Sequence, residues 1–350
     1  MRTFLISIFF LFISLNFLSA QTKYEKIDSV LNHYYENGKF NGSALVSVNG
    51  KAIYKKGFGY SNFEWSVKNE PDTKFNIGSC TKQFTSALIM MLHQENKLSL
   101  DDNISKYIPE YPADKGTKIT IHNLLSHSSG IPEYFSLPQM QELAFKENNP
   151  DEFIKIFWDL ELEFEPGSEV RYSNSGYFVL GKIIEIITGK PYAQVLQEKI
   201  FQPLFMLNSG LINIRKVLEK RAYGYIKMND TLMVAPYFHP SGAFSAGSIY
   251  STVEDLLKWQ NSLQSFSILS EESIDKMTTP GKTGYGYGFA IMNLTSENGE
   301  TRILFGHEGQ IFGFRSLIQI YKEENNSVIF LDNNQNTELG KIAREIRAFL

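Results

Sequence analysis

The sequence predicts a mixed α/β fold of the α+β type, in which helices flank an antiparallel sheet that is joined to a mostly helical lobe. The 350 residues, 43% of them hydrophobic, are enough for a large core. Strand-like segments gather near both ends of the chain, whereas helical, proline-punctuated sequence fills the middle, so both ends are expected to complete one sheet. We expect a single domain over 21–350, with a sheet lobe at about 21–97 and 212–350 and a helical lobe at about 98–211.

The first twenty residues (1–20) predict a secretory signal peptide. Met1-Arg2 gives a positive start, an apolar run follows from Phe4 to Leu18, and Ala20 is a small residue suited to cleavage. The run is short for a membrane span, although an uncleaved anchor remains the alternative. We therefore expect a secreted or periplasmic protein with no stable membrane insertion after cleavage. Cys80 is the only cysteine, so no intramolecular disulfide is available.

Local signals predict the elements of the first half. Amphipathic spacing over 23–38 favours a helix that ends at a glycine. Apolar runs at 43–48 and 52–54 flank Asn49-Gly50, a pair that favours a two-residue hairpin turn. A further helix is expected over 175–187, where isoleucine, leucine and valine recur on one side.

The C-terminal part of the chain is strand-rich. Its short segments are aromatic or β-branched and are bounded by glycine or asparagine. We expect strands at 285–292, 302–305, 314–321 and 327–331, and a last helix at about 338–349.

Composition excludes several classes of function. A net charge of −4 and the lack of a basic run argue against nucleic acid as a partner. The six histidines are scattered without the spacing of metal ligands, so no metal or other cofactor is expected. The expected partner is a small-molecule or peptide substrate, and the oligomeric state is left open.

The first chemical motif is Ser79-Cys80-Thr81-Lys82, which precedes an apolar stretch with helical spacing. The three-residue offset places Ser79 and Lys82 on one helix face, one turn apart. A neutral lysine amine can take the proton of a serine hydroxyl if desolvation lowers its pKa. The pattern alone is weak, because it recurs at Ser273-Ile274-Asp275-Lys276, to which we assign no chemistry.

The second motif is Tyr172-Ser173-Asn174. A tyrosine phenol near a cationic lysine can be held partly as phenolate and can accept or relay a proton. The Asn174 amide can donate to a substrate carbonyl and accept from the lysine.

The third motif is His307-Glu308-Gly309, between an apolar strand and a second strand, with glycine where a substrate backbone could approach. Lys282-Thr283-Gly284 is a competing candidate, but no strand leads into it. We therefore favour His307.

Together these motifs resemble the penicillin-recognising serine hydrolases, which include class C β-lactamases, D-alanyl-D-alanine carboxypeptidases, D-aminopeptidases and related esterases. That family carries Ser-x-x-Lys, Tyr-x-Asn and Lys-or-His-x-Gly in this order. The resemblance extends over essentially everything after residue 24, and it includes the stretches Phe75-Asn76-Ile77-Gly78, Leu124-Leu125-Ser126-His127-Ser128-Ser129-Gly130, Glu165-Pro166-Gly167 and Tyr285-Gly286-Tyr287-Gly288-Phe289.

The resemblance implies a β-lactamase/transpeptidase-like fold with the active site in the cleft between the lobes. It implies that Ser79 is the acylated nucleophile, that Lys82 and Tyr172 share the acid–base work, and that Asn174 orients the substrate. The backbone N–H groups of Ser79 and Gln310 would form the oxyanion hole. His127 is interpreted as structural.

Two departures bear on the substrate. Glu308 stands where family members that bind a carboxylate often carry a hydroxyl residue, and a carboxylate about 4 Å away would be repelled by roughly 1–4 kcal/mol. His307 in place of lysine also removes a fixed positive charge. We therefore expect an exported serine hydrolase of peptides, amides or esters, D-amino-acid compounds included. The alternatives are a β-lactamase or D-Ala-D-Ala carboxypeptidase, and a non-catalytic binder or sensor of cell-wall peptides.

Overall fold

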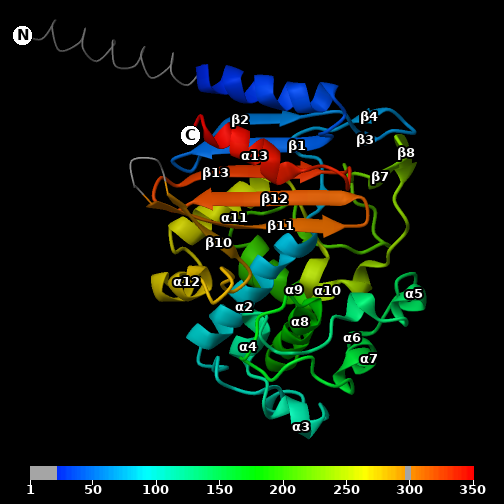
Figure 1. The fold of residues 1–350 in the computed structure, drawn as a ribbon, viewed down its shortest axis with the longest axis vertical. Coiled ribbons are helices and arrows are strands. Elements are labelled where there is room, and N and C mark those ends of the chain that lie inside the picture. Colours follow the sequence, from blue (N-terminus) through cyan, green and yellow to red (C-terminus); the bar gives the residue numbers. More distant parts are fainter. Residues whose placement is uncertain (1–21, 296–300) are drawn as a thin grey trace, which may run out of the picture.

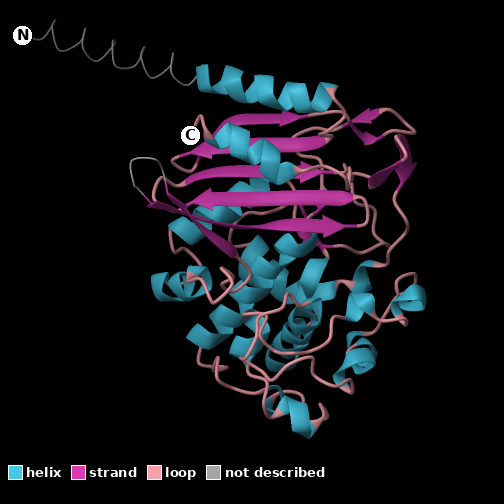
Figure 2. Ribbon diagram, viewed as in Figure 1, coloured by secondary structure: helices cyan, strands magenta, loops and turns pink. Residues whose placement is uncertain are grey.

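The computed structural model describes residues 22–295 and 301–350, and it confirms an antiparallel sheet with helices against both faces (Figures 1 and 2). The predicted signal peptide, 1–20, lies outside the described residues. Six strands pair in the order β10-β11-β12-β13-β1-β2, and each neighbouring pair is antiparallel. Their bounds are Gly42–Val48 (β1), Lys51–Gly57 (β2), Ala290–Thr295 (β10), Thr301–Ile311 (β11), Phe314–Tyr321 (β12) and Asn326–Asp332 (β13).

Smaller strands pair away from this sheet. Their bounds are Tyr60–Asn62 (β3), Val67–Lys68 (β4), Phe75–Asn76 (β5), Gly210–Leu211 (β6), Tyr225–Met228 (β7), Thr231–Val234 (β8) and Ile249–Ser251 (β9). The order β5-β9-β6 forms one group, and β3–β4 and β7–β8 are separate pairs.

The longer helices are residues 22–36, α2 (Thr81–Gln94), α8 (Asn174–Thr188), α11 (Val253–Gln264), α12 (Glu271–Thr278) and α13 (Leu339–Arg347). Shorter ones are α3 (Ala113–Gly116), α4 (Ile121–Leu125), α5 (Met140–Leu143), α6 (Pro150–Phe153), α7 (Lys155–Trp158), α9 (Tyr192–Leu196) and α10 (Phe244–Gly247). Single turns of other helix types are η1 (Gly78–Cys80), η2 (Ile104–Lys106), η3 (Tyr134–Ser136), η4 (Gln197–Phe201) and η5 (Pro240–Gly242). No described helix combines the length and apolar character needed to cross a bilayer.

The β1–β2 hairpin forms around the predicted turn. Asn49 and Gly50 have φ angles of 50° and 71°, the left-handed values that a type I′ turn requires. β13 pairs with the other edge of β1, opposite Gly42 to Ser47. The first hairpin of the chain is therefore built into the sheet by the last strand.

Two apolar clusters cover opposite faces of the sheet. The outer one joins Leu31 of the first helix and Ile342 of α13 to strand residues such as Leu317. The inner one begins one residue further along β12, at Ile318, and continues into α2, α8 and α11. The sheet and the helices below it therefore share one continuous core.

The prediction of a strand over 285–292 is wrong for its first half, because β10 begins only at Ala290. A Cβ at Gly286 would lie 2.1 Å from the Met277 carbonyl oxygen, and one at Gly288 would lie 2.7 Å from that of Lys82. The backbone therefore turns here against α12 and α2. β11, by contrast, is longer than predicted and contains the whole His307-Glu308-Gly309 motif.

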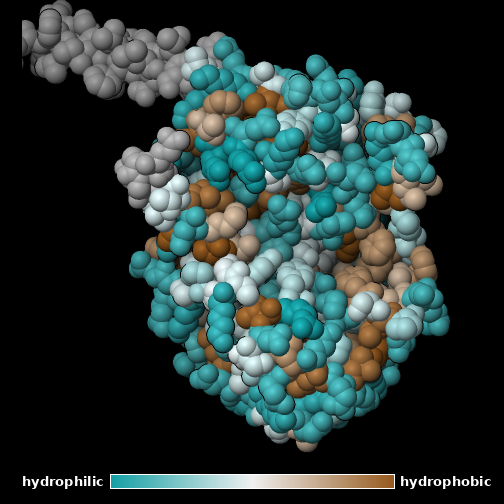
Figure 3. Space-filling view, viewed as in Figure 1, coloured by the Kyte–Doolittle hydropathy of each residue, from teal (hydrophilic) through white to brown (hydrophobic). Residues whose placement is uncertain are grey.

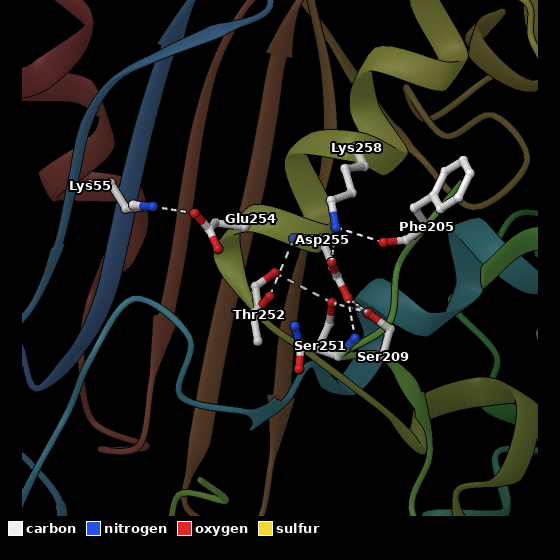
Figure 4. Close-up of polar contacts among 9 residues, drawn as sticks. Lys55, Phe205, Ser209, Ser251, Thr252, Glu254, Asp255 and Lys258 are labelled. Atoms are coloured by element: carbon white, nitrogen blue, oxygen red, sulfur yellow. Dashed lines mark hydrogen bonds and ion pairs between the residues drawn. The ribbon is translucent and has the colours of Figure 1, made fainter. Parts of the chain in front are cut away.

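The start of α11 is tied to neighbouring segments through the buried carboxylate of Asp255 (Figure 4). This carboxylate accepts hydrogen bonds from the Asn208 backbone N–H (2.7 Å) and the Ser209 hydroxyl (2.9 Å), and it pairs with Lys258 (2.7 Å). Thr252 caps the helix by accepting from the Asp255 backbone N–H. A buried charge is tolerated here because each oxygen has partners.

A second buried carboxylate, Asp332, lies at the end of β13 and has weaker compensation. It accepts from the backbone N–H groups of Asn41 (3.0 Å) and Asn334 (2.6 Å), opposite Arg315 in the neighbouring strand. Burial nevertheless raises the pKa of Asp332 to about 7.

Asp332 should make the protein less stable as the pH rises. A folded-state pKa above the unfolded value means that the folded state binds the extra proton, so this contribution is present at about pH 4 and is lost as the pH rises through 7. We expect the stability of wild type relative to Asp332→Asn to fall by ~3 kcal/mol between pH 4 and pH 8, measured by urea unfolding. Asp28→Asn is the control, because Lys56 and Tyr54 hold the pKa of Asp28 low against a desolvation that raises it. The free energy of unfolding of wild type relative to Asp28→Asn should rise over the same pH range. If the free energy of unfolding of wild type relative to Asp332→Asn did not change with pH, the raised pKa of Asp332 would be contradicted.

Candidate active site

Ser79 lies in η1, the turn that leads into α2, and this turn packs directly on β11. Two glycines permit the approach. A Cβ at Gly78, where φ is 49°, would lie 3.0 Å from the Gln310 nitrogen, and a Cβ at Gly309 would lie 2.1 Å from the Ile77 oxygen. Behind Ser79 the buried Cys80 thiol donates to the His307 carbonyl at 3.1 Å.

The Lys82 amine is fully buried and faces Ser79. Its Nζ lies 3.1 Å from Ser79 Oγ, 2.7 Å from Asn174 Oδ1 and 2.9 Å from the Ala246 carbonyl oxygen. All three neighbours are neutral. Desolvation therefore dominates and lowers the pKa of Lys82 to about 7, against a smaller opposing effect of the Glu133 charge.

A neutral Lys82 amine fits this cage as a base. Its two N–H groups can donate to Asn174 Oδ1 and to the Ala246 carbonyl, neither of which has a proton to give. The lone pair is then left for the Ser79 hydroxyl proton. Near neutral pH the amine is therefore free to accept that proton in a substantial fraction of molecules.

The Tyr172 ring lies beside this amine, with Lys82 Nζ 4.8 Å from the ring centroid. Its hydroxyl is buried and has no hydrogen-bond partner of good geometry among the described residues, although Ser79 is near enough to lower the pKa of Tyr172. Desolvation outweighs that effect and raises the pKa of Tyr172 well above its usual range. The direction of this shift favours a protonated phenol over the partial phenolate that a cationic lysine could have held.

Asn174 begins α8, and a residue that sequence reasoning missed sets its orientation. The Glu133 carboxylate accepts from the Asn174 backbone N–H at 2.6 Å and from its side-chain amide at 3.2 Å. Donation of the amide N–H₂ to Glu133 turns Oδ1 toward Lys82. Glu133 lies 41 residues before Asn174, so no local spacing in the sequence announces the contact.

His307 faces the same cluster of side chains from β11. Its Nδ1 donates to the Glu308 carbonyl, so Nε2 carries the lone pair, and this atom is buried without a partner among the described residues. Burial, with a smaller effect of Lys82, lowers the pKa of His307 to about 4. The ring is thus neutral at pH 7.

The Gln310 backbone N–H opens toward Ser79. Ile311 and Phe314 flank the two-residue turn between β11 and β12, and hydrogen-bonded pairs alternate along such a ladder. The Gln310 N–H therefore points away from β12, toward Gly78. β10 pairs with β11 only as far as Gly306, which leaves this edge open.

Glu308 lines the cleft, but its carboxylate is turned to the outer face of the sheet. One of its oxygens lies 3.0 Å from where a Cβ at Gly340, in the first turn of α13, would be placed. Its charge still reaches the site, because it contributes to a raised pKa of Tyr285 after the larger effect of burial. Arg315 also lines the cleft, and its Nε donates to the Gln335 carbonyl at 3.0 Å. The rim therefore carries both signs of charge.

Ser79, Tyr172, Asn174 and the stretch from His307 to Gln310 line one cleft of about 730 Å³, with Lys82 buried beneath it. Figure 3 shows this face hollowed between the sheet and the helices, with apolar side chains to the right of the hollow. The competing motifs lie elsewhere. Lys276 of the second Ser-x-x-Lys pattern bonds Glu272 in α12, and Lys282 lies in an exposed turn.

Comparisons with known proteins agree with this arrangement. Residues 27–350 match the family described as Beta-lactamase. The protein PbpX of Bacillus subtilis (strain 168) is 32% identical over 350 residues, which cover 95% of this chain and 82% of that protein. The teichoic acid D-alanine hydrolase of Staphylococcus aureus (strain MRSA252) is 31% identical over 300 residues, or 84% of this chain and 71% of that enzyme.

Among solved structures, the D-amino acid amidase of Ochrobactrum anthropi SV3 superposes with a TM-score of 0.81 at 25% identity, and the match covers 94% of this chain and 98% of that one. The predicted fold class is therefore confirmed by a structural relative as well as by the strand order. The chain belongs to the Beta-lactamase family, whose members similar to it include hydrolases.

Proposed function

We propose that this chain is an exported serine hydrolase that cleaves an amide or ester through an acyl-enzyme on Ser79. The observation that carries the proposal is the Lys82 amine, which is fully buried, has neutral hydrogen-bond partners and lies 3.1 Å from Ser79 Oγ. A structural lysine would gain nothing from a pKa near 7, whereas a general base is most effective there. Export rests on the signal-like sequence of residues 1–20.

In the acylation step, Lys82 takes the Ser79 proton while Oγ forms a bond to the substrate carbonyl carbon. The carbonyl oxygen becomes an oxyanion that the N–H groups of Ser79 and Gln310 stabilise. The new ammonium then donates to all three of its neighbours. Collapse of the intermediate breaks the bond to the leaving amine or alcohol.

The protonated phenol of Tyr172 supplies the proton that the leaving group takes, and Lys82 can restore it. These roles follow from the directions of the two pKa shifts. The lowered pKa of Lys82 makes it the base before reaction, and the raised pKa of Tyr172 makes it the acid. Water then attacks the acyl-enzyme by the reverse sequence and releases Ser79.

The substrate class that we propose is a D-aminoacyl amide or ester, or a related neutral acyl compound. Two of the similar proteins carry this chemistry in their names, as a D-alanine hydrolase and a D-amino acid amidase. The neutral His307 supports a substrate without a carboxylate at that place, and the Glu308 charge adds a weaker repulsion because its carboxylate is turned to the outer face of the sheet. A β-lactamase or carboxypeptidase is the competing assignment.

Ser79 should be the residue that an active-site probe labels. We expect intact-mass spectrometry to show one fluorophosphonate adduct on wild type and on Ser273→Ala, and none on Ser79→Ala. Ser273→Ala is the matched control, because it removes the serine of the second Ser-x-x-Lys pattern. Labelling that survives Ser79→Ala would overturn the proposed function.

A parallel incubation with a fluorescent penicillin, and hydrolysis of a D-aminoacyl amide, a p-nitrophenyl ester and nitrocefin, separates the substrate classes.

Activity should depend on the neutral form of Lys82. Because the base must be deprotonated, we expect kcat/KM for a p-nitrophenyl ester to rise with pH and to level off above an apparent pKa near 7. Lys82→Met should lower kcat/KM by ~10²-fold or more and should abolish the rise of kcat/KM with pH. A rate that stays flat between pH 5 and 9 in wild type would contradict the role of Lys82, since His307 titrates near 4 and adds nothing in this range.

Removal of the Glu308 charge should favour substrates that bear a carboxylate. For Glu308→Gln, and for Glu308→Thr, we expect the ratio of kcat/KM for a carboxylate-bearing to a neutral substrate to rise about 2- to 5-fold at low salt, and less at high salt. Arg315→Gln removes the opposite charge from the same rim and should lower this ratio. An unchanged ratio in both Glu308 variants would refute the charge argument.

A further inference from the structure

Tyr172 lies in a segment without regular structure, although its ring must be held at a fixed place. Residues 161–173 form neither helix nor strand, and α8 begins only at Asn174. Side chains on helices or strands are positioned by their own ladders of hydrogen bonds, but an irregular segment depends on partners from elsewhere in the chain. For this segment the partners come from the loop 127–130, where Ser128 and Gly130 accept from the backbone N–H groups of Gly167 and Glu163.

His127 supplies the contacts on either side of Tyr172. Its carbonyl oxygen accepts from the Arg171 backbone N–H at 2.8 Å, and its Nδ1 accepts from the Ser173 backbone N–H at 3.1 Å. Between these two bonds, the imidazole lies against the Tyr172 ring, with the centroids 4.5 Å apart and the planes tilted by 33°. Arg171, the Tyr172 ring and Ser173 thus all contact His127, through either its side chain or its backbone carbonyl.

The conformation of His127 shows that this geometry has a cost. Its φ is 58°, a left-handed value that is uncommon for residues other than Gly, although His, like Asn, adopts it more often than most. The ring is almost fully buried, and burial lowers the pKa of His127 well below its usual range. A neutral ring whose Nδ1 accepts a hydrogen bond from the Ser173 N–H must carry its own hydrogen on Nε2, so protonation of Nδ1 would remove the acceptor that holds Ser173.

We propose that His127 is the positioning residue of Tyr172: it touches no substrate, and it holds the phenol where the leaving group is protonated. This inference rests on the proposed hydrolase function. It assigns a role to a histidine that the sequence indicated only as structural. The Glu133 carboxylate holds Asn174 in the same way, so neighbouring residues of one motif are positioned by two different loop residues.

Two variants of His127 separate its contacts. His127→Asn keeps an acceptor on the same side-chain position and tolerates the left-handed φ, but it loses the ring. His127→Phe keeps a ring and loses the acceptor. We expect kcat for ethyl acetate, an ester whose alkoxide must be protonated as it leaves, to fall about 10- to 100-fold in His127→Phe and less in His127→Asn, with KM changed less than kcat in both.

The deciding measurement is a double-mutant cycle with Tyr172→Phe, which removes the hydroxyl that His127 is proposed to position. His127→Phe should then cost less than about 2-fold further in kcat, because the two residues act as a unit. The same fractional loss in both backgrounds would mean a general structural role and would overturn the proposal. It would also be overturned if Tyr172→Phe alone left kcat unchanged.

Circular dichroism and thermal unfolding of all five proteins, wild type and the four variants, check that each one is folded at the assay temperature. Fluorophosphonate labelling of Ser79 separates this proposal from the proposed function. If wild type is not labelled at Ser79, the hydrolase assignment fails. If wild type is labelled and hydrolyses the ester but the cycle is additive, only the role of His127 fails.

Discussion

A primary amine buried against neutral oxygens is the constraint on which the site depends. Lys82 has lost its hydration, and a carboxylate in direct contact would have restored a charged ammonium of ordinary pKa. The fold instead surrounds it with the Ser79 hydroxyl, the Asn174 amide and a backbone carbonyl from α10. Asn174 lies between Glu133 and Lys82, so the Glu133 carboxylate orients the Asn174 amide without bonding the Lys82 amine. The reactivity of Ser79 is therefore a property of the whole core around α2, rather than of a short motif.

Short-range patterns in the sequence predicted much of this structure. Asn49-Gly50 gave the hairpin because the left-handed turn angles suit those two residues, and the bounds of β12 match the predicted segment. The three-residue offset between Ser79 and Lys82 was enough to place their side chains together, since one turn of backbone decides it. Each of these features depends on neighbours a few residues apart.

What the sequence did not reveal depends on distant contacts. Residues 285–292 alternate like a strand, but the first half turns because its glycines lie against the backbone of other helices. The protonated state of Tyr172 follows from a burial that only the folded chain creates. Glu133 and His127 support the Tyr-x-Asn motif from more than forty residues away, so no spacing rule could have connected them to it. The sequence therefore predicted the motif residues themselves, but it did not predict that Glu133 and His127 position them.

Cys80 lies in the seam between η1 and β11, where the Ser316 hydroxyl donates to its sulfur and the thiol donates to the His307 carbonyl. Burial raises the pKa of Cys80 to about 12, so the sulfur is not a thiolate at any physiological pH and is closed to alkylating reagents and oxidants while the seam is intact. Because it is the only cysteine in the chain, its reaction with a thiol reagent would measure how often the nucleophile-bearing turn detaches from the sheet. The reactivity of Cys80 is thus a built-in probe of local opening at the active site.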